Sequence, residues 1–411
     1  MRAVLRTFCL VGAVISANAF GDDRPAPPAV SGAPQNVTIN VVYLGRAYSE
    51  PEPLSLMQTI PTDNGVAGAK LAAQEINTTG KFLSRQYVLD TKVLPADGDL
   101  IALAKEVLAT KPAVIVADLE TSDLLAVAAL PGAAEAVILD ARTIDDSVRQ
   151  ENCRQNVFHL LPSRAMRTDA LAQFLIFKHW PRWFLLKGVS ERDEAYAADV
   201  RRSAGRFGAK IVEERTYSYD PGARRVDTGF QQIQTQMPLA TRGAPSYDVL
   251  VVADEDDQFG DYLPYNTFDA RPIVGTQGLV ATAWHPGFQE YSALQMQHRF
   301  KNFAHRDMTE RDYAGWLALR IVGEAVIRSG KTAPADLKAY LLSDQFEVAG
   351  FKGQGLTFRR WDQQLRQPVL LAQDLLVTSI SPQEGFLHPK FLTDTLGFDE
   401  PETKCRPSLS H

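Results

Sequence analysis

Strand-like apolar runs alternate with helix-like segments along most of this chain, and that order is the strongest constraint on its fold. Residues 37–44, VTINVVYL, are rich in β-branched side chains, and the segment at 65–77 repeats alanine and isoleucine at helical spacing. The run AVIVA at 113–117 is apolar at every position, which is typical of parallel strands that helices cover on both faces. The sequence therefore predicts an α/β fold with parallel sheets.

A second series of alternating segments begins after Pro162, so the chain holds two successive βαβ series. Because each series forms its own layered sheet, this order predicts two doubly wound lobes. A longer helix is expected at 311–329, and a glycine-led segment, FKGQGLTFRRWDQQLRQPVLLAQ, comes later in the chain. In that segment we expect residues 356–358 and 369–372 to pair as a hairpin around a turn at 361–363.

The first residues have the pattern of a secretory signal. Residues 1–19 carry Arg2 and Arg6, then an apolar run, then small residues that end at Ala19. The run is too short to span a bilayer, so we predict cleavage near Ala19 and export to the periplasm. Residues 20–35, rich in Pro, Ala and Gly, are expected to be a flexible leader.

The net charge indicates which partners to exclude, and the cysteine content indicates whether a disulfide is expected. The formal net charge of −6 argues against a nucleic-acid partner, and no run beyond the signal approaches transmembrane length. Two cysteines remain after signal removal, Cys153 and Cys405. In an oxidising compartment an isolated pair is more often a disulfide than a metal or catalytic site, so we predict that these two are bonded.

No motif indicates an enzyme or a cofactor. The chain has no G-x-G-x-x-G after its first strand, no G-x-x-x-x-G-K-[ST], no H-E-x-x-H and no G-x-S-x-G. Its seven histidines are scattered without metal-ligand spacing. Ser, His and Asp all occur, so a catalytic triad stays open, but nothing points to one. We therefore predict a protein that needs no cofactor and is not an enzyme.

The order of elements resembles the type I periplasmic solute-binding proteins, the branched-chain amino acid binding family of ABC transporters, over essentially the whole mature chain. NGVAGAKLAAQEINTTGKFLSRQYVL is similar to that family's first helix and following strand, and AYAADVRRSAGRFGAKIVEE to a unit of its second lobe. The glycine-led segment is similar to its closing hairpin, although Phe358-Arg359 stands where the family commonly has Phe-Asp. The resemblance implies two lobes joined by a three-segment hinge, with the hairpin returning to lobe two.

This resemblance also implies boundaries for the lobes. Lobe one is expected at residues 36–158 and 285–346, and lobe two at 159–284 and 347–375. Residues 376–411 are then a C-terminal tail.

Two further stretches resemble a narrower group. CRQNVFHLLPSRAMRTDALAQFL and the tail sequence FLHPKFLTDTLGFDEPETKC are similar to solute-binding proteins associated with PQQ-dependent alcohol dehydrogenase systems. The tail is absent from ordinary amino acid binders. The resemblance implies transport near periplasmic alcohol oxidation by a monomer whose partners are an ABC permease and its ATPase subunits. A related suggestion is uptake of the lanthanide that those dehydrogenases use.

In two-lobed α/β folds, ligands bind beyond the carboxyl ends of the strands, where loops and helix N-termini converge. Five loops follow the strands expected here, and they define the candidate ligand-binding residues. These are Arg46, Tyr48, Asp118, Glu120, Thr121, Ser122, Asp140, Ala141, Arg142, Thr143, Asp254, Glu255, Asp256 and Gln277.

Matching the amino acid binders residue by residue gives an incomplete site. Thr121 and Ser122 fall where hydroxyls and helix N–H groups hold the ligand carboxylate, and Ala141 and Thr143 fall in the next such loop. Gln277, however, stands where that family has the acid that recognises the amine. A neutral amide cannot supply the charge-assisted bond that an ammonium prefers, so we predict that common aliphatic amino acids do not bind tightly.

Acidic residues suggest one alternative ligand. Hard cations prefer carboxylate and carbonyl oxygens, and opposing lobes could assemble such a cage on closure. The candidate metal ligands are Asp118, Glu120, Asp140, Glu255 and Asp256, with Asp254 beside them.

In the competing interpretation these acids are helix caps or solvated loop residues. Asp140 and Asp254 then cap helices and Asp118 pairs with Arg142, which leaves a nearly neutral pocket for an aromatic alcohol product. Four further residues could line that pocket or simply pack between elements, namely Tyr48, Tyr196, Trp284 and His285.

We expect the protein to capture a small solute and deliver it to the permease by hinge closure. A sensory receptor with the same fold and an enzyme of alcohol oxidation stay open as alternatives.

Overall fold

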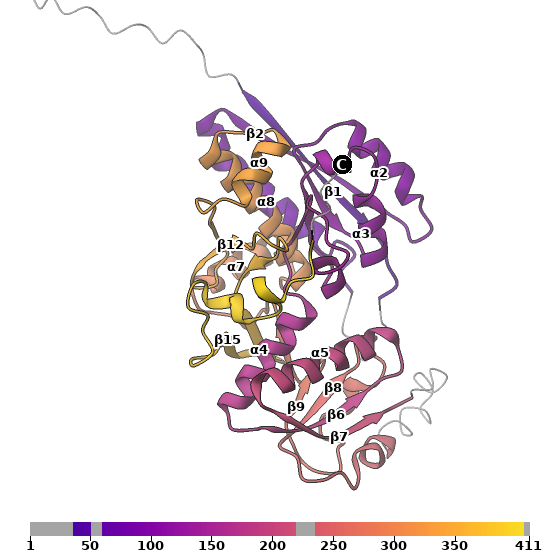
Figure 1. The fold of residues 1–411 in the computed structure, drawn as a ribbon. Helices are drawn as coiled ribbons and strands as arrows, with labels where there is room; N and C mark the ends of the chain where they lie inside the picture. The colour runs from indigo at the N-terminus through magenta and orange to yellow at the C-terminus, as the bar shows by residue number, and fades with distance from the viewer. Residues whose placement is uncertain (1–35, 51–59, 219–234, 407–411) are drawn as a thin grey trace, which may run out of the picture. The chain divides into compact units, whose positions relative to one another are not determined.

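The computed structural model describes residues 36–50, 60–218 and 235–406. The predicted signal and the predicted leader both lie outside these residues. In the described part of the chain, strands and helices alternate as expected, and the result is an α/β fold with two larger, mainly parallel sheets and a small antiparallel sheet, β11-β12-β13 (Figure 1).

Five parallel strands among the described residues form sheet A, in the order β2-β1-β3-β4-β5. Strands β3 and β4 are buried at every position, because hydrophobic clusters cover both faces of the sheet. The strands are β1 Val37–Arg46, β2 Arg85–Leu94, β3 Val114–Asp118, β4 Ile138–Asp140 and β5 Val157–His159.

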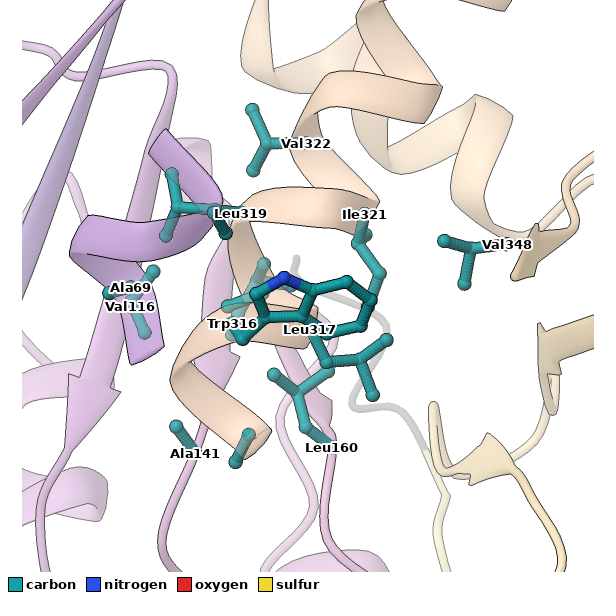
Figure 2. Packing of buried hydrophobic residues seen from close by; sticks show 14 of the residues in the cluster. Ala69, Val116, Ala141, Leu160, Trp316, Leu317, Leu319, Ile321, Val322 and Val348 are labelled. Carbon is teal, nitrogen blue, oxygen red and sulfur yellow. The ribbon is translucent and has the colours of Figure 1, made fainter. Parts of the chain in front are cut away.

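Helices from both ends of the chain cover sheet A. Helix α8 packs against α1 so closely that a Cβ on Gly68 would lie 1.8 Å from the carbonyl oxygen of Asp312, which explains a glycine inside a helix. Trp316 of α8 is buried in the same cluster (Figure 2). The helices are α1 Val66–Gly80, α2 Leu100–Ala109, α3 Thr121–Ala128, α7 Ala293–Ala304, α8 Glu310–Ser329 and α9 Pro334–Leu341.

Sheet B has seven strands, in the order β15-β14-β10-β9-β8-β6-β7, and it too is buried on both faces. Its strands are parallel except β14 and β15, which run antiparallel at one edge. Among all the described residues, no helix is long and apolar enough to cross a membrane. The elements are α4 Arg164–Phe177, β6 Arg182–Lys187, α5 Glu191–Phe207, β7 Lys210–Thr216, β8 Val249–Ala253, β9 Ile273–Gly275, β10 Leu279–Thr282, β14 Val369–Gln373 and β15 Leu376–Ser381.

The predicted hairpin near the C-terminus is wrong in its pairing. Strand β12, Gly355–Phe358, pairs with β11, Val348–Ala349, and with β13, Leu365–Arg366, whereas β14 belongs to sheet B. The two expected partners separate because they bury their side chains in different places. Leu356 joins the core around α8, and Leu371 joins the core of sheet B.

Two segments also lie outside the lobes that we assigned to them. β15 pairs with β14 in sheet B, although its residues were expected in the tail. Val348 and Leu356 pack beside α8, although residues 347–375 were expected in lobe two. β15 is an edge strand with several half-exposed positions, so its apolar pattern is too weak to separate it from a tail.

Within the described residues the chain enters or leaves the layer of sheet B three times. The passages lie at 160–163, between β5 and α4, at 283–292, between β10 and α7, and at 367–368, between β13 and β14. The three-segment connection that the resemblance implied is therefore present.

Buried polar side chains join the three passages to one another. Gln364 donates from Nε2 to the carbonyl of Leu161 at 3.0 Å. The Lys352 ammonium donates to the carbonyl of Pro368 at 3.1 Å and also to the carbonyl of Ala283. Burial lowers the pKa of Lys352 to about 7, because the charged form has lost its water.

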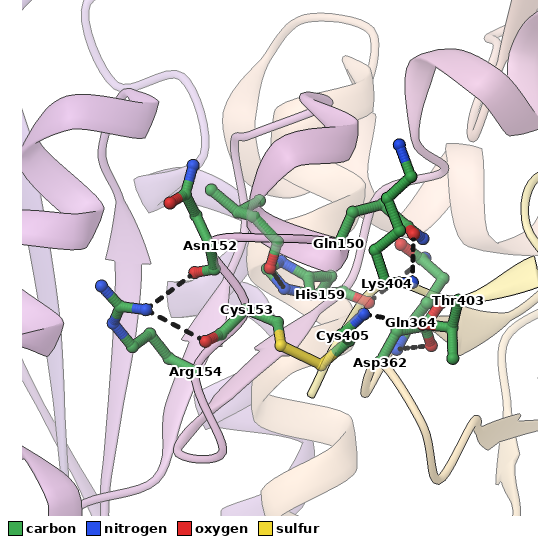
Figure 3. The surroundings of a disulfide bond; sticks show 11 residues. Gln150, Asn152, Cys153, Arg154, His159, Asp362, Gln364, Thr403, Lys404 and Cys405 are labelled. Atoms are coloured by element: carbon green, nitrogen blue, oxygen red, sulfur yellow. Dashed lines mark hydrogen bonds between the residues drawn. A yellow bond between two sulfur atoms is a disulfide. The ribbon is translucent and has the colours of Figure 1, made fainter. Parts of the chain in front are cut away.

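The C-terminal tail is fastened at two places. The first is the predicted disulfide, in which Cys153 and Cys405 have their Cα atoms 5.5 Å apart and lie 252 positions apart in the chain (Figure 3). Beside it the backbone N–H of Lys404 donates to Gln150 Oε1 at 2.7 Å. The end of the tail is therefore attached to the loop that precedes β5 of sheet A.

The second attachment is a set of three buried charged residues, Arg359, Arg366 and Asp394, which we call the tail anchor. Each arginine Nε lies 2.9 Å from the Asp394 carboxylate, and all three residues are at most 6% exposed. Arg359 also donates to the carbonyl of Leu396 at 2.8 Å. The departure at Phe358-Arg359 from the family's Phe-Asp thus coincides with a contact that holds the tail.

Candidate functional site

The loop after β1 holds the start of α3 in place. Arg46 pairs with Asp123 at 2.8 Å, and the Tyr48 hydroxyl donates to the same carboxylate at 2.6 Å. That hydroxyl also accepts the backbone N–H of Glu120 at 3.0 Å. Burial, followed by the hydrogen bond to Asp123, raises the pKa of Tyr48. Both predicted residues therefore position a helix N-terminus.

The N-terminus of α3 has no side-chain cap. The Glu120 side chain, at the N-cap position, makes no hydrogen bond to the helix, and only its carbonyl accepts the Leu124 N–H at 2.8 Å. The Thr121 hydroxyl donates to Asp145. Ser122 is exposed. Because the first N–H groups of a helix have no partner inside it, the first turn of α3 presents donors at this edge of sheet A.

Four charged residues lie next to this helix start, and we call them the strand-end cluster: Glu50, Asp118, Arg142 and Arg311. Asp118 lies 3.3 Å from Arg142 and 3.2 Å from Arg311, and Glu50 contacts both arginines. The Arg142 guanidinium also lies 4.5 Å above the Tyr48 ring. Glu120 lies 3.6 Å from Arg142 as a third acid, so every carboxylate named here faces an arginine.

Asp140 organises the turn after β4 from a fully buried position. It accepts the backbone N–H groups of Arg142 and Thr143 at 3.1 and 2.9 Å, and it lies 2.8 Å from His159 Nδ1. Burial opposes ionisation, but the His159 contact and the Arg149 charge outweigh it and hold the pKa of Asp140 below its usual range.

The neighbours of Asp140 are occupied as well. Ala141 is 2% exposed and bonded to the backbone of β3, and Thr143 also donates its hydroxyl to Asp140. The predicted residues of this loop therefore build the turn, and Arg142 alone extends toward the strand-end cluster.

In the loops of sheet B, too, the predicted polar side chains bond to groups of neighbouring loops or of their own loop. Asp254 accepts backbone N–H groups from Gln258, Phe259 and Gly260 at 2.7–2.9 Å, although burial raises its pKa. Gln277 donates from Nε2 to the Asp254 carbonyl at 3.0 Å and to Asp257 at 2.9 Å. Its amide is therefore committed to this loop.

Arg164 connects the loops of the two sheets. Its guanidinium binds Glu255 with two hydrogen bonds, of 2.7 and 2.8 Å, and Asp145 with a third of 2.8 Å. Arg192 lies 3.6 Å from Glu255 and 3.5 Å from Asp256. Although burial disfavours the charge, the two carboxylates raise the pKa of Arg164 above its ordinary value.

The predicted cation cage is not formed. Among the residues that the structure describes, no group of three or more His, Cys, Asp or Glu side chains could hold a metal ion. Each candidate ligand instead faces an arginine or backbone N–H groups. Of the competing interpretation, the pair of Asp118 with Arg142 is present, whereas Asp140 and Asp254 hold turns where helix caps were expected.

Sequence reasoning missed the arginines that neutralise this region. Arg164 is the first residue of α4 and Arg311 the second residue of α8. A cation in the first turn of a helix opposes the helix dipole, so each position carried a signal that a carboxylate partner lay nearby. The same search would have pointed to Glu50 and Asp145 as partners.

Of the four aromatic candidates, two are buried in the core and two lie in loops. Tyr196 and Trp284 are buried in the core, where Trp284 stacks on Tyr313 at 4.6 Å. His285 accepts the backbone N–H of Gly287 at 3.1 Å. Tyr48 is the member of this group that contacts the strand-end residues.

The comparisons with known proteins agree with this architecture. Residues 58–239 match the family model described as periplasmic binding protein. No curated protein sequence matches the chain.

Solved structures share the fold over most of the chain at low sequence identity. A leucine-, isoleucine-, valine-, threonine- and alanine-binding protein from Brucella ovis, in a closed conformation, superposes with a TM-score of 0.63 at 13% identity, covering 90% of this chain and 98% of that one. An ABC transporter substrate-binding protein from Desulfitobacterium hafniense in complex with Leu gives 0.63 at 16%, covering 84% and 99%. One from Sphaerobacter thermophilus gives 0.65 at 15%, covering 84% and 98%. The chain thus has the fold of type I periplasmic binding proteins.

Proposed function

We propose that this protein is the periplasmic solute-binding component of an ABC transporter, with a permease and ATPase subunits as partners. The family match, the shared fold and the three passages into or out of the layer of sheet B support this role. The resemblance of the tail to proteins of PQQ-dependent alcohol dehydrogenase systems supports a place beside periplasmic alcohol oxidation. Solute capture by hinge closure then precedes delivery to the permease.

The solute in this proposal is a small organic molecule without an ammonium group, derived from an alcohol. The observation that carries this choice is the pairing of the acids at the strand ends. Glu255 is held by two hydrogen bonds from Arg164, Asp118 lies between two arginines, and Gln277 donates to its own loop. An ammonium would therefore find no unpaired carboxylate at these positions. The structure from Desulfitobacterium hafniense, by contrast, was solved with leucine, which carries an ammonium.

The first turn of α3 and the strand-end cluster are the proposed contact surface. Uncapped helix N–H groups suit a hydroxyl or carboxylate oxygen, and Arg142 lies beside them over the Tyr48 ring. A ring or short alkyl chain would pack on Tyr48, and the oxygen would meet the donors of α3.

The test is calorimetric titration of the mature protein with phenyl-substituted alcohols. We expect saturable binding that Ser122→Leu weakens at least tenfold, because the larger side chain covers the helix start. Ala126→Leu is the matched control, since Ala126 is exposed on the same helix one turn later and should leave affinity unchanged. Equal affinities in both variants, or no binding in the whole panel, would overturn the proposal.

A further inference from the structure

A cavity lies between the tail and the small sheet β11-β12-β13, away from the strand ends. It has a volume of about 370 Å³, within the range of small-molecule sites. Three aromatic residues and three cations line much of its wall, with Asp344 and Glu400 as the lining acids. The six are Phe358, Trp361, Phe391, Arg360, Arg366 and Lys390.

Arg366 brings a buried charge to this cavity with part of its hydrogen-bonding capacity unused. The residue is 6% exposed, its Nε binds Asp394 at 2.9 Å, and its Nη1 donates to the Phe358 carbonyl at 2.7 Å. Within the described chain, Nη2 makes no hydrogen bond. Nη2 is therefore the guanidinium nitrogen of Arg366 that is available to donate to a bound acceptor.

The aromatic walls add a second unpaired donor and a stacking surface. The Arg366 guanidinium lies 3.8 Å from the Phe391 ring centre and 5.2 Å from that of Trp361. The indole Nε1 of Trp361 is buried and finds no hydrogen-bond partner in the described residues. A planar ligand could lie against these rings while its oxygens meet the donors.

The cations at this cavity differ in whether an acid already pairs with them. Arg360 is already paired with Asp344 at 2.8 Å, and Arg366 is paired with Asp394. Lys390 is exposed and has no acidic partner among the residues described. Its ammonium is therefore free to contact a carboxylate at the wall of the cavity.

We propose that this cavity is a second binding site, distinct from the strand-end loops, for a small planar carboxylate. The carboxylate lies between Arg366 Nη2 and the Lys390 ammonium, and the planar part packs against Trp361 and Phe391. Because β13 leads directly into the passage at 367–368, the occupant would sit next to one of the three passages.

Benzoate is the probe, titrated into the full mature chain by calorimetry and followed by tryptophan fluorescence. We expect saturable binding that Lys390→Gln and Trp361→Phe each weaken at least tenfold. Lys105→Gln, which removes an exposed lysine of α2, should change nothing. Benzyl alcohol, which lacks the carboxylate, and cyclohexanecarboxylate, which lacks a planar ring, should each bind this site at least tenfold more weakly than benzoate.

These variants leave the tail anchor intact, and a thermal unfolding midpoint near that of the wild type would show that they fold. Ser122→Leu should retain benzoate binding at this cavity, which separates the present site from the strand-end loops. Unchanged benzoate affinity in Lys390→Gln and Trp361→Phe, loss of binding in Ser122→Leu alone, or no saturable binding would each overturn the proposal.

Discussion

The strand-end cluster and the tail anchor are built from the same chemistry, arginines against carboxylates, but they differ in burial and geometry. In the tail anchor the side chains are 1–7% exposed and the Nε atoms lie 2.9 Å from Asp394. In the strand-end cluster exposure reaches 22% for Arg311 and 34% for Glu50, and the contacts to Asp118 are 3.2–3.3 Å.

This difference separates a structural role from a binding role. A desolvated ion cluster is destabilised strongly when one partner is removed, whereas a partly solvated one can exchange partners at little cost. The tail anchor therefore fixes the tail, whereas the strand-end cluster can change its ion pairs at lower cost, as the proposed binding of a solute requires.

Removal of the shared carboxylate in the tail anchor should have the largest effect on stability. In Asp394→Asn two buried guanidinium groups would lose their negative partner, so we expect a loss of about 3–5 kcal/mol in the free energy of unfolding. Denaturant unfolding measures this. The control is Asp307→Asn, whose exposed pair with Lys301 at 3.0 Å should contribute no more than about 1 kcal/mol. Similar small losses in the two variants would contradict the structural role of the anchor.

Removal of the disulfide should rank next. Cys153→Ser together with Cys405→Ser opens a loop of 252 residues in the unfolded chain, and we expect a loss of about 2–4 kcal/mol. Unfolding of the double variant should be compared with that of the wild type before and after reduction. The account fails here if the double variant is as stable as the oxidised wild type.

Lys352 is a buried cation that, unlike the arginines of both clusters, forms no ion pair with a carboxylate, and its effect on stability should depend on pH. Its pKa is about 7 in the folded protein against an ordinary 10.5, so between these values the unfolded state binds more protons. Stability should therefore rise with pH across this window, by on the order of 1–2 kcal/mol between pH 7 and 9, and Lys352→Met should remove that rise. Parallel pH profiles of the wild type and the variant would exclude this behaviour.

The smallest effect on stability is expected in the strand-end cluster. In Arg142→Gln, Arg311 still pairs with Asp118 and Glu50, so the free energy of unfolding should change by no more than about 1 kcal/mol. Solute affinity should nevertheless fall at least tenfold, because the guanidinium over Tyr48 is lost. A large loss of stability with unchanged affinity would reverse the roles assigned to the two clusters.

The sequence was informative wherever a local pattern decides the structure. Continuous apolar runs such as 113–117 predicted parallel buried strands. The disulfide is a separate case, because Cys153 and Cys405 are the two cysteines left after the signal and the pairing followed from their number. The strand-end loops also followed, because in parallel sheets the polar residues after each strand meet at one edge.

Partnerships between distant residues could not be predicted in the same way. Arg311, the second partner of Asp118, was missed because it lies 193 positions away, on a helix whose packing no local pattern reveals. The predicted hairpin failed for a related reason, since the separation of Leu356 from Leu371 depends on which core each side chain enters.

Calorimetric titration with benzyl alcohol and benzylamine tests the central claim most directly, because the two differ chiefly in a hydroxyl against an ammonium. Leucine completes the set as the ligand of the relative from Desulfitobacterium hafniense. The pairing of Asp118 and Glu255 with arginines predicts saturable binding of the alcohol, weakened in Ser122→Leu, and no tight binding of benzylamine or leucine. Micromolar binding of either ammonium compound, with no response to the alcohol, would contradict the account.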